Sequence, residues 1–108
     1  MTPDPGRLRR RLVLEAPAET ADGAGGVLRT YAPVATLWAA VEPRSARAAV
    51  EADGDGAAIT HRILLRAGPA IGTRHRFRLG TRVFRVLAVR DHDPAGRFLA
   101  IDAEERAD

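Results

Sequence analysis

Arginine alternates with apolar side chains at a period of two residues through much of the second half of the sequence. The pattern runs through residues 60–66, 74–90 and 97–101, where arginine separates leucine, valine, isoleucine and phenylalanine. Successive side chains of a β-strand point to opposite faces of a sheet, so this spacing places arginines on one face and apolar groups on the other. The chain is therefore expected to form a β-meander with an arginine-rich outer face.

The rest of the sequence extends this prediction to a small all-β domain. We expect one domain over residues 1–108, built as an antiparallel β-barrel or sandwich of about six strands. Extended segments are predicted at residues 8–15, 27–31, 34–42, 58–66, 74–79, 81–90 and 97–104. Pro17 is expected to end the first of them. Residues 43–57 break the pattern and are expected to form one inserted short helix or long loop.

The apolar positions that keep the period-two phase predict the core, and Trp38 is the largest candidate. The predicted core residues are Leu12, Leu14, Trp38, Ile63, Phe77, Phe84, Val86 and Phe98. Residues 83–89 are apolar on both faces, so their second face needs a cover. We expect that cover to come from the short helix or from a neighbouring subunit.

No pattern in the sequence predicts catalysis, and we expect no enzyme, cofactor or metal site. Cysteine is absent, which excludes disulfides and thiolate ligands. The cluster Asp91-His92-Asp93 precedes Pro94-Ala95-Gly96, so a role in a hairpin turn is expected for it. His61 and His75 have no partner at metal-ligand spacing and are expected to be structural. Glycine-rich residues 22–26 lack the lysine of a P-loop.

The charge of the chain leaves two interpretations open. All 17 basic residues are arginine, and the formal net charge is +3. The arginines either form a solvated surface balanced by the 14 acidic residues, or they form a surface that meets nucleic acid. No apolar run is long enough to span a membrane, and the first residues lack the apolar core of a signal peptide. We expect synthesis in the cytoplasm and no membrane partner.

The order of several short motifs resembles a known family. They are GRLRRRL (residues 6–12), DGAGG (22–26), LWAAVEP (37–43), THRI (60–63), GTRVFRV (80–86) and DHD (91–93). Together they resemble the phage head–tail joining family, which comprises head-closure or stopper proteins of tailed bacteriophages and phage-like gene transfer agents. The resemblance covers nearly the whole chain.

The resemblance implies a small β-barrel subunit of a homo-oligomeric ring in the neck of a virion or gene transfer agent particle. Such a ring lies between an adaptor on the portal side and a tail terminator protein, and it retains packaged double-stranded DNA. Six copies are the first expectation, and twelve are the alternative. In this family the long loop between the second and third main strands lines or plugs the channel. The corresponding channel-facing and DNA-facing residues here are Arg44, Arg47, Glu51, Asp53 and Asp55.

A free-standing small β-barrel that binds nucleic acid is the alternative function. Such a protein needs exposed aromatic side chains on a basic face, because bases stack on them. Phe77, Phe84 and Phe98 instead fall in phase with the apolar positions, and Tyr31 stands alone. The connector is therefore the main prediction.

Overall fold

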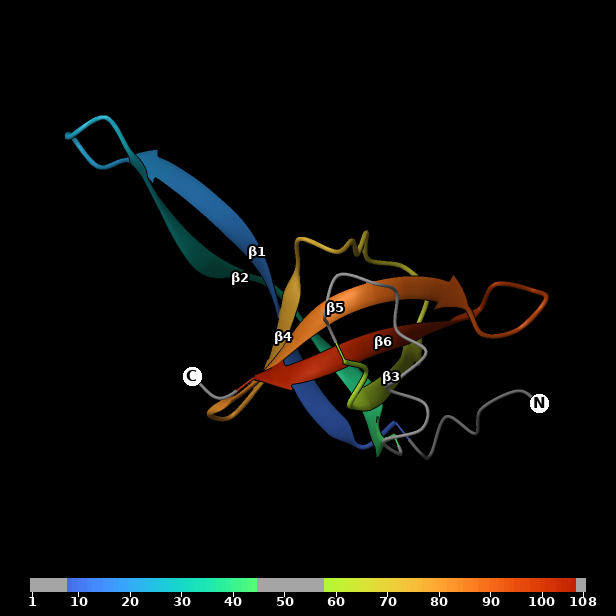
Figure 1. The fold of residues 1–108 in the computed structure, drawn as a ribbon. Coiled ribbons are helices and arrows are strands. Elements are labelled where there is room, and N and C mark those ends of the chain that lie inside the picture. The colour runs from blue at the N-terminus through green and yellow to red at the C-terminus, as the bar shows by residue number, and fades with distance from the viewer. Residues whose placement is uncertain (1–7, 45–57, 107–108) are drawn as a thin grey trace.

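Six antiparallel strands close into a barrel in the computed structural model, which describes residues 8–44 and 58–106 (Figure 1). The strands are β1 (Arg10–Ala21), β2 (Val27–Pro43), β3 (His61–Arg66), β4 (Arg76–Leu79), β5 (Arg82–Asp91) and β6 (Phe98–Arg106). Their order around the barrel is β1-β2-β3-β6-β5-β4. The predicted all-β, antiparallel fold is confirmed. Most of the predicted inserted segment, residues 45–57, lies outside the described residues.

Apolar side chains from the strands fill the barrel interior. The structure buries all but one of the predicted core residues: Leu12, Leu14, Ile63, Phe77, Phe84 and Val86 in the barrel interior, and Phe98 in a separate cluster. Phe77 and Phe84 are the largest of the fully buried side chains, and they lie opposite each other in the β4–β5 ladder. The arginines of these strands alternate with the core positions, as the period-two pattern predicts.

Trp38 was wrongly predicted as a core residue, because its side chain is 57% exposed. It pairs with Arg11 across the β1–β2 ladder, on the outer face. The inward positions beside it belong to Leu37, which packs against the core, and to Ala39, which is fully buried. The side chain was assigned by its size, whereas the alternation along β2 decides which face it takes.

A second apolar cluster lies on the outer face of the sheet. Along β3, Ile63, Leu64 and Leu65 are all buried, so this strand is covered on both faces. Leu64 belongs to a separate cluster from the barrel core, formed by Leu8, Ala40, Leu64, Phe98 and Ala100. The clearest two-faced strand is therefore β3, although residues 83–89 were predicted to hold that role.

A β-bulge explains the apolar run on β5. The register of the β5–β6 ladder shifts between Val86 and Ala88. The extra residue reverses the alternation, so Val86 and Val89 both pack toward the barrel core although they are three positions apart. Half of the six apolar residues in the run, Phe84, Val86 and Val89, thus pack toward the barrel core.

The strands β1 and β2 continue beyond the barrel as a two-stranded arm, residues 16–32 (Figure 1). The ladder of β1 with β4 ends at Glu15, and that of β2 with β3 begins only at Ala39, so both edges of the arm are open. The arm makes the molecule 52 Å long but only 29 and 26 Å across. Pro17 does not end the first strand as predicted, because proline is tolerated at an open strand edge.

The barrel closes where β1 meets β4 in a short ladder from Val13 to Glu15. The carboxylate of Glu15 is buried there, and it accepts hydrogen bonds from Arg76 Nε at 2.6 Å and Arg78 Nε at 3.3 Å. The β1–β2 register also shifts between Leu14 and Glu15. One carboxylate therefore joins the seam of the barrel at the point where the arm begins.

Replacing Phe84 by alanine is expected to lower the free energy of unfolding by about 3–5 kcal/mol, because it leaves a cavity in the core. Replacing the exposed Trp38 by alanine should lower it by less than about 1 kcal/mol. Urea titration of both variants measures the difference. Equal losses would contradict the placement of these two side chains.

Replacing Glu15 by glutamine is expected to destabilise the fold by about 1–3 kcal/mol, because the two guanidinium groups lose their charged acceptor at the seam. Glu19→Gln is the matched control. Glu19 pairs with Arg29 and Arg74 at the surface, and its loss should cost no more than about 1 kcal/mol. The same urea titration compares the two variants, and a larger effect at Glu19 would show that the seam does not depend on Glu15.

Candidate functional site

The residues predicted to face a channel fall at the border of the described part of the chain. Arg44 is exposed, and its backbone N–H donates to the Thr60 carbonyl oxygen over 2.8 Å. The other predicted channel residues, Arg47, Glu51, Asp53 and Asp55, lie outside the described residues, as does the predicted short helix. Their role stays a prediction.

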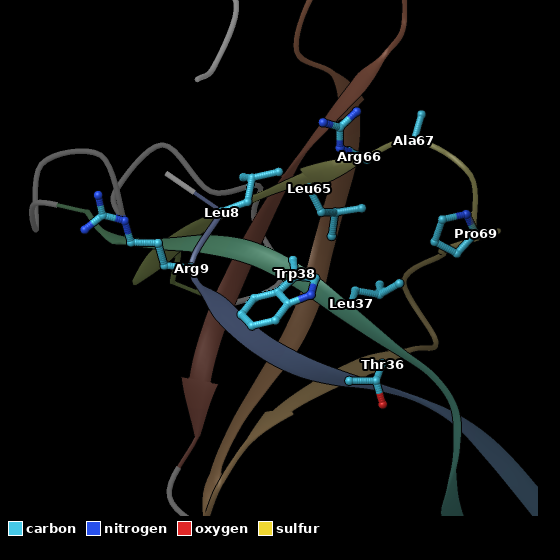
Figure 2. A pocket seen from close by; sticks show the side chains of 9 residues that line it. All are labelled: Leu8, Arg9, Thr36, Leu37, Trp38, Leu65, Arg66, Ala67 and Pro69. Atoms are coloured by element: carbon cyan, nitrogen blue, oxygen red, sulfur yellow. The ribbon is translucent and has the colours of Figure 1, made fainter. Parts of the chain in front are cut away.

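An apolar groove of about 770 Å³ lies beside the end of the β2–β3 ladder, where Leu37 and Leu65 of the barrel core meet Leu8 of the outer cluster (Figure 2). Its apolar lining consists of Leu8, Leu37, Trp38, Leu65, Ala67 and Pro69. The residue Leu8 belongs both to this groove and to the outer cluster, so the two form one continuous apolar surface. We call this surface the Trp38 groove.

Arginines border the Trp38 groove. Figure 2 shows Arg9, just before β1, and Arg66, at the end of β3, at its margin, with Trp38 on β2. The guanidinium of Arg11 lies 5.5 Å from the Trp38 ring centroid, within the range of a cation–π contact. None of the described residues that line the groove is acidic. The groove is thus an exposed apolar surface with a positive rim.

A second surface, the arginine cleft, lies between the arm and the outer face of β4 and β5. Its volume is about 510 Å³, and its lining in residues 8–44 and 58–106 includes no acidic side chain. Its polar lining includes Arg29 and Tyr31 from the arm, Arg74 from the loop before β4, Arg76 from β4, Arg85 from β5 and Arg106 from the end of β6. The fold therefore gathers arginines from four elements into one cleft.

Glutamates outside the lining hold most of these arginines. Glu19 lies 2.9 Å from Arg29 Nη2 and 3.4 Å from Arg74 Nη2. The hydrogen bond to this carboxylate raises the pKa of Arg29 further. Glu104 Oε1 lies 3.2 Å from Arg106 Nε, as an ion pair without hydrogen-bond geometry. Carboxylates that do not line the cleft thus hold these guanidinium groups in position.

The base of the cleft is the seam of the barrel. Arg76, which bonds Glu15, also places its guanidinium carbon 3.9 Å from the centroid of the Tyr31 ring. This cation–π contact joins the arm to β4 and fixes the plane of the guanidinium. Tyr31 is therefore covered on one face by an arginine, and the aromatic face is not open there for base stacking.

The Asp91-His92-Asp93 cluster forms a hairpin turn, as predicted. Asp93 Oδ1 accepts hydrogen bonds from the backbone N–H groups of Arg97 and Phe98, each over 3.0 Å. Burial raises the pKa of Asp93, but these bonds outweigh it and hold the pKa below its ordinary value. In residues 8–44 and 58–106, no three metal-ligating side chains form a group that could hold an ion.

The two remaining histidines have structural partners. His61 packs its ring edge against Phe84, with centroids 5.1 Å apart, and burial lowers the pKa of His61. His75 accepts a hydrogen bond at Nδ1 from the Gly72 N–H over 3.0 Å, within the loop before β4. Both fit the structural role expected of them.

The sequence predicted an arginine-rich outer face but did not reveal the arginine cleft. Arg29 and Tyr31 lie far from Arg74 and Arg85 in the sequence, and only the length of the arm and the β1–β4 ladder bring them together. The alternation of arginine along residues 74–85 was the available signal. It identified the face of the sheet but not the neighbour across it.

No helix in the part of the chain that the structure describes is long and apolar enough to cross a membrane. No curated protein matches the sequence.

Two solved structures are similar along nearly the whole chain. A chain in the virion of a native gene transfer agent particle is 33% identical, with a TM-score of 0.65; the match covers 93% of this chain and 96% of that one. The solution structure of protein SF1141 from Shigella flexneri 2a is 30% identical, with a TM-score of 0.74, and the match covers 97% and 98% of the two chains.

The family comparison agrees with these similarities. The model of the phage head completion protein family matches residues 3–106, which include all six strands, the arm and both surfaces described above. The chain therefore belongs to the phage head completion protein family.

Proposed function

We propose that this chain is a subunit of a ring in the head–tail neck of a phage or gene transfer agent particle. There it joins the portal-side adaptor to the tail terminator and helps to retain packaged double-stranded DNA. The observation that carries the proposal is the near-complete match to the head completion family and to a chain of a gene transfer agent virion. A structural role in completing the head follows from the family and favours a non-enzymatic protein.

Two unlike surfaces support assembly into a ring. The arm projects from the barrel with both edges open, and its Val27 and Leu28 are 65% and 57% exposed. The Trp38 groove offers an uncovered apolar surface on the barrel. When one patch of a subunit contacts a different patch of the next, the assembly is a ring wherever the rotation between subunits closes. We infer that the arm of one copy seats in the groove of its neighbour, in a ring of six copies, with twelve as the alternative.

Charge complementarity supports this pairing. The tip of the arm carries Asp22, whose carboxylate accepts backbone hydrogen bonds from Ala24 and Gly26. These bonds lower the pKa of Asp22, so its negative charge is kept at neutral pH. The rim of the groove carries Arg9 and Arg66. An acidic, apolar tip thus meets a basic, apolar groove.

The single tryptophan reports on this contact without any label. In the isolated chain, which we expect to be a monomer, Trp38 fluorescence should be readily quenched by acrylamide because the indole is exposed. Quenching should fall when the ring assembles on adaptor complexes, and sedimentation should show the change in mass. A variant with Val27 and Leu28 replaced by serine should fold but should not gain this protection. Persistent quenching in an assembled ring would contradict the role of the groove.

Particle production tests the function itself. Without this chain, heads should package DNA but fail to join tails, and the packaged DNA should then leak out. The double variant Arg44→Ala, Arg47→Ala should join heads to tails but yield particles with less DNA, because it removes charge from the predicted channel loop. Arg90→Ala, Arg97→Ala removes the same charge at the β5–β6 hairpin and should retain DNA. Normal tailed particles in the absence of the chain would overturn the proposed function.

A further inference from the structure

We propose that the arginine cleft binds the phosphate backbone of double-stranded DNA. The inference rests on the proposed function, because a ring in the neck surrounds the path of the DNA. The cleft shares no lining residue with the Trp38 groove.

The cleft carries more positive than negative charge. Five arginines line it, namely Arg29, Arg74, Arg76, Arg85 and Arg106. Four of them pair with three glutamates, Glu15, Glu19 and Glu104, so an excess of positive charge remains. Such a cleft attracts a polyanion.

The bonds from the cleft arginines to glutamate use only some of their donors. Arg74 uses Nη2 and Arg76 uses Nε, and neither partner carboxylate lines the cleft. A guanidinium has five N–H donors, so further donors are left for phosphate. Guanidinium groups bind phosphate oxygens in a two-pronged geometry, and pre-positioned side chains lose less conformational entropy on binding. Arg85 adds a further charge, since it lies opposite Arg76 in the β4–β5 ladder.

One edge of the cleft is connected to a border of the segment predicted to face the channel. Glu104, which pairs with Arg106, also accepts a hydrogen bond at Oε2 from the Ala58 N–H over 3.2 Å. Residue 58 is where the described chain resumes after that segment. Arg106 is therefore connected through Glu104 to this border, whereas the arm residues of the cleft lie near the start of β2 and Arg44 follows its end.

The chemistry of the cleft fits the backbone of DNA and not its bases. The face of Tyr31 that meets Arg76 is occupied, and the three phenylalanines are buried. Contacts from arginine to phosphate hold DNA without reading its sequence. Binding should therefore be weak for one subunit, indifferent to sequence and steeply dependent on salt.

Fluorescence anisotropy of the full chain with short double-stranded DNA tests the cleft. Two DNAs of different sequence should bind alike, with an affinity that falls as salt rises. The variant Arg74→Ala, Arg85→Ala removes two exposed arginines of the cleft and should reduce the slope of log affinity against log salt by about 1.8, since each phosphate contact contributes about 0.9. The variant Arg90→Ala, Arg97→Ala makes the same change in net charge away from the cleft and should keep the wild-type slope.

Three outcomes would overturn the proposal. They are equal slopes for the two double variants, no DNA binding at low salt, and binding to polyglutamate as tight as to DNA, which would assign the cleft to an acidic protein segment. Particle assembly separates this proposal from the proposed function. If the chain is needed to join heads to tails but fails these binding tests, the proposed function holds and the DNA-binding role of the cleft is refuted. If the cleft binds DNA but particles form normally without the chain, the DNA-binding role holds and the proposed function is refuted.

Discussion

The ion pairs of Glu15 with Arg76 and Arg78 are the interaction on which the rest of the molecule depends. They lie in the short β1–β4 ladder that turns six strands into a closed barrel. The arm starts at the next residue of β1, and the guanidinium of Arg76 forms the base of the arginine cleft. A buried carboxylate is costly unless it is paired, so the two arginines must be in place whenever the barrel is closed. Closure of the fold and construction of the cleft are therefore one event.

The barrel supports three features that a domain of this size would not need for its own stability. The arm leaves both of its strand edges open, the groove leaves the largest side chain exposed, and the cleft concentrates like charges. Each is unfavourable in an isolated monomer, since open edges and apolar patches promote association and clustered arginines repel. All three become favourable in an assembly that supplies a neighbouring subunit and a polyanion. This pattern is typical of a subunit and not of a free-standing protein.

Much of the fold could be predicted from the sequence, because a two-residue period fixes both the strand and the inward face. The segments that became β3, β4, β5 and β6 were placed within a few residues, and Phe77 and Phe84 were assigned to the interior by phase. The prediction that Trp38 lies in the core was wrong because the size of the side chain was given more weight than its position in the two-residue period. The bulges beside Leu14 and Val86 have no sequence signal as clear as a glycine, and each changes the phase of the residues beyond it. The length of the arm was not predicted because a proline, here Pro17, normally ends a strand.

The sites were less predictable than the fold. Alternation identifies the outer face of a strand, but the partner of that face depends on the ladder order and on how far the arm extends. Arg29 meets Arg74 through Glu19, and nothing local to either residue indicates the other. The loop residues from Arg47 to Asp55 came from the resemblance alone. They lie outside the described residues, so their role is still a prediction.

A cryo-electron microscopy map of the particle neck tests the central claim most directly. The account predicts a ring of these barrels between the portal-side adaptor and the tail, with Trp38 covered by the neighbouring subunit and the arginine clefts turned toward the DNA. A neck that lacks this chain would contradict the account, as would a ring in which Trp38 faces solvent and the clefts face away from the DNA.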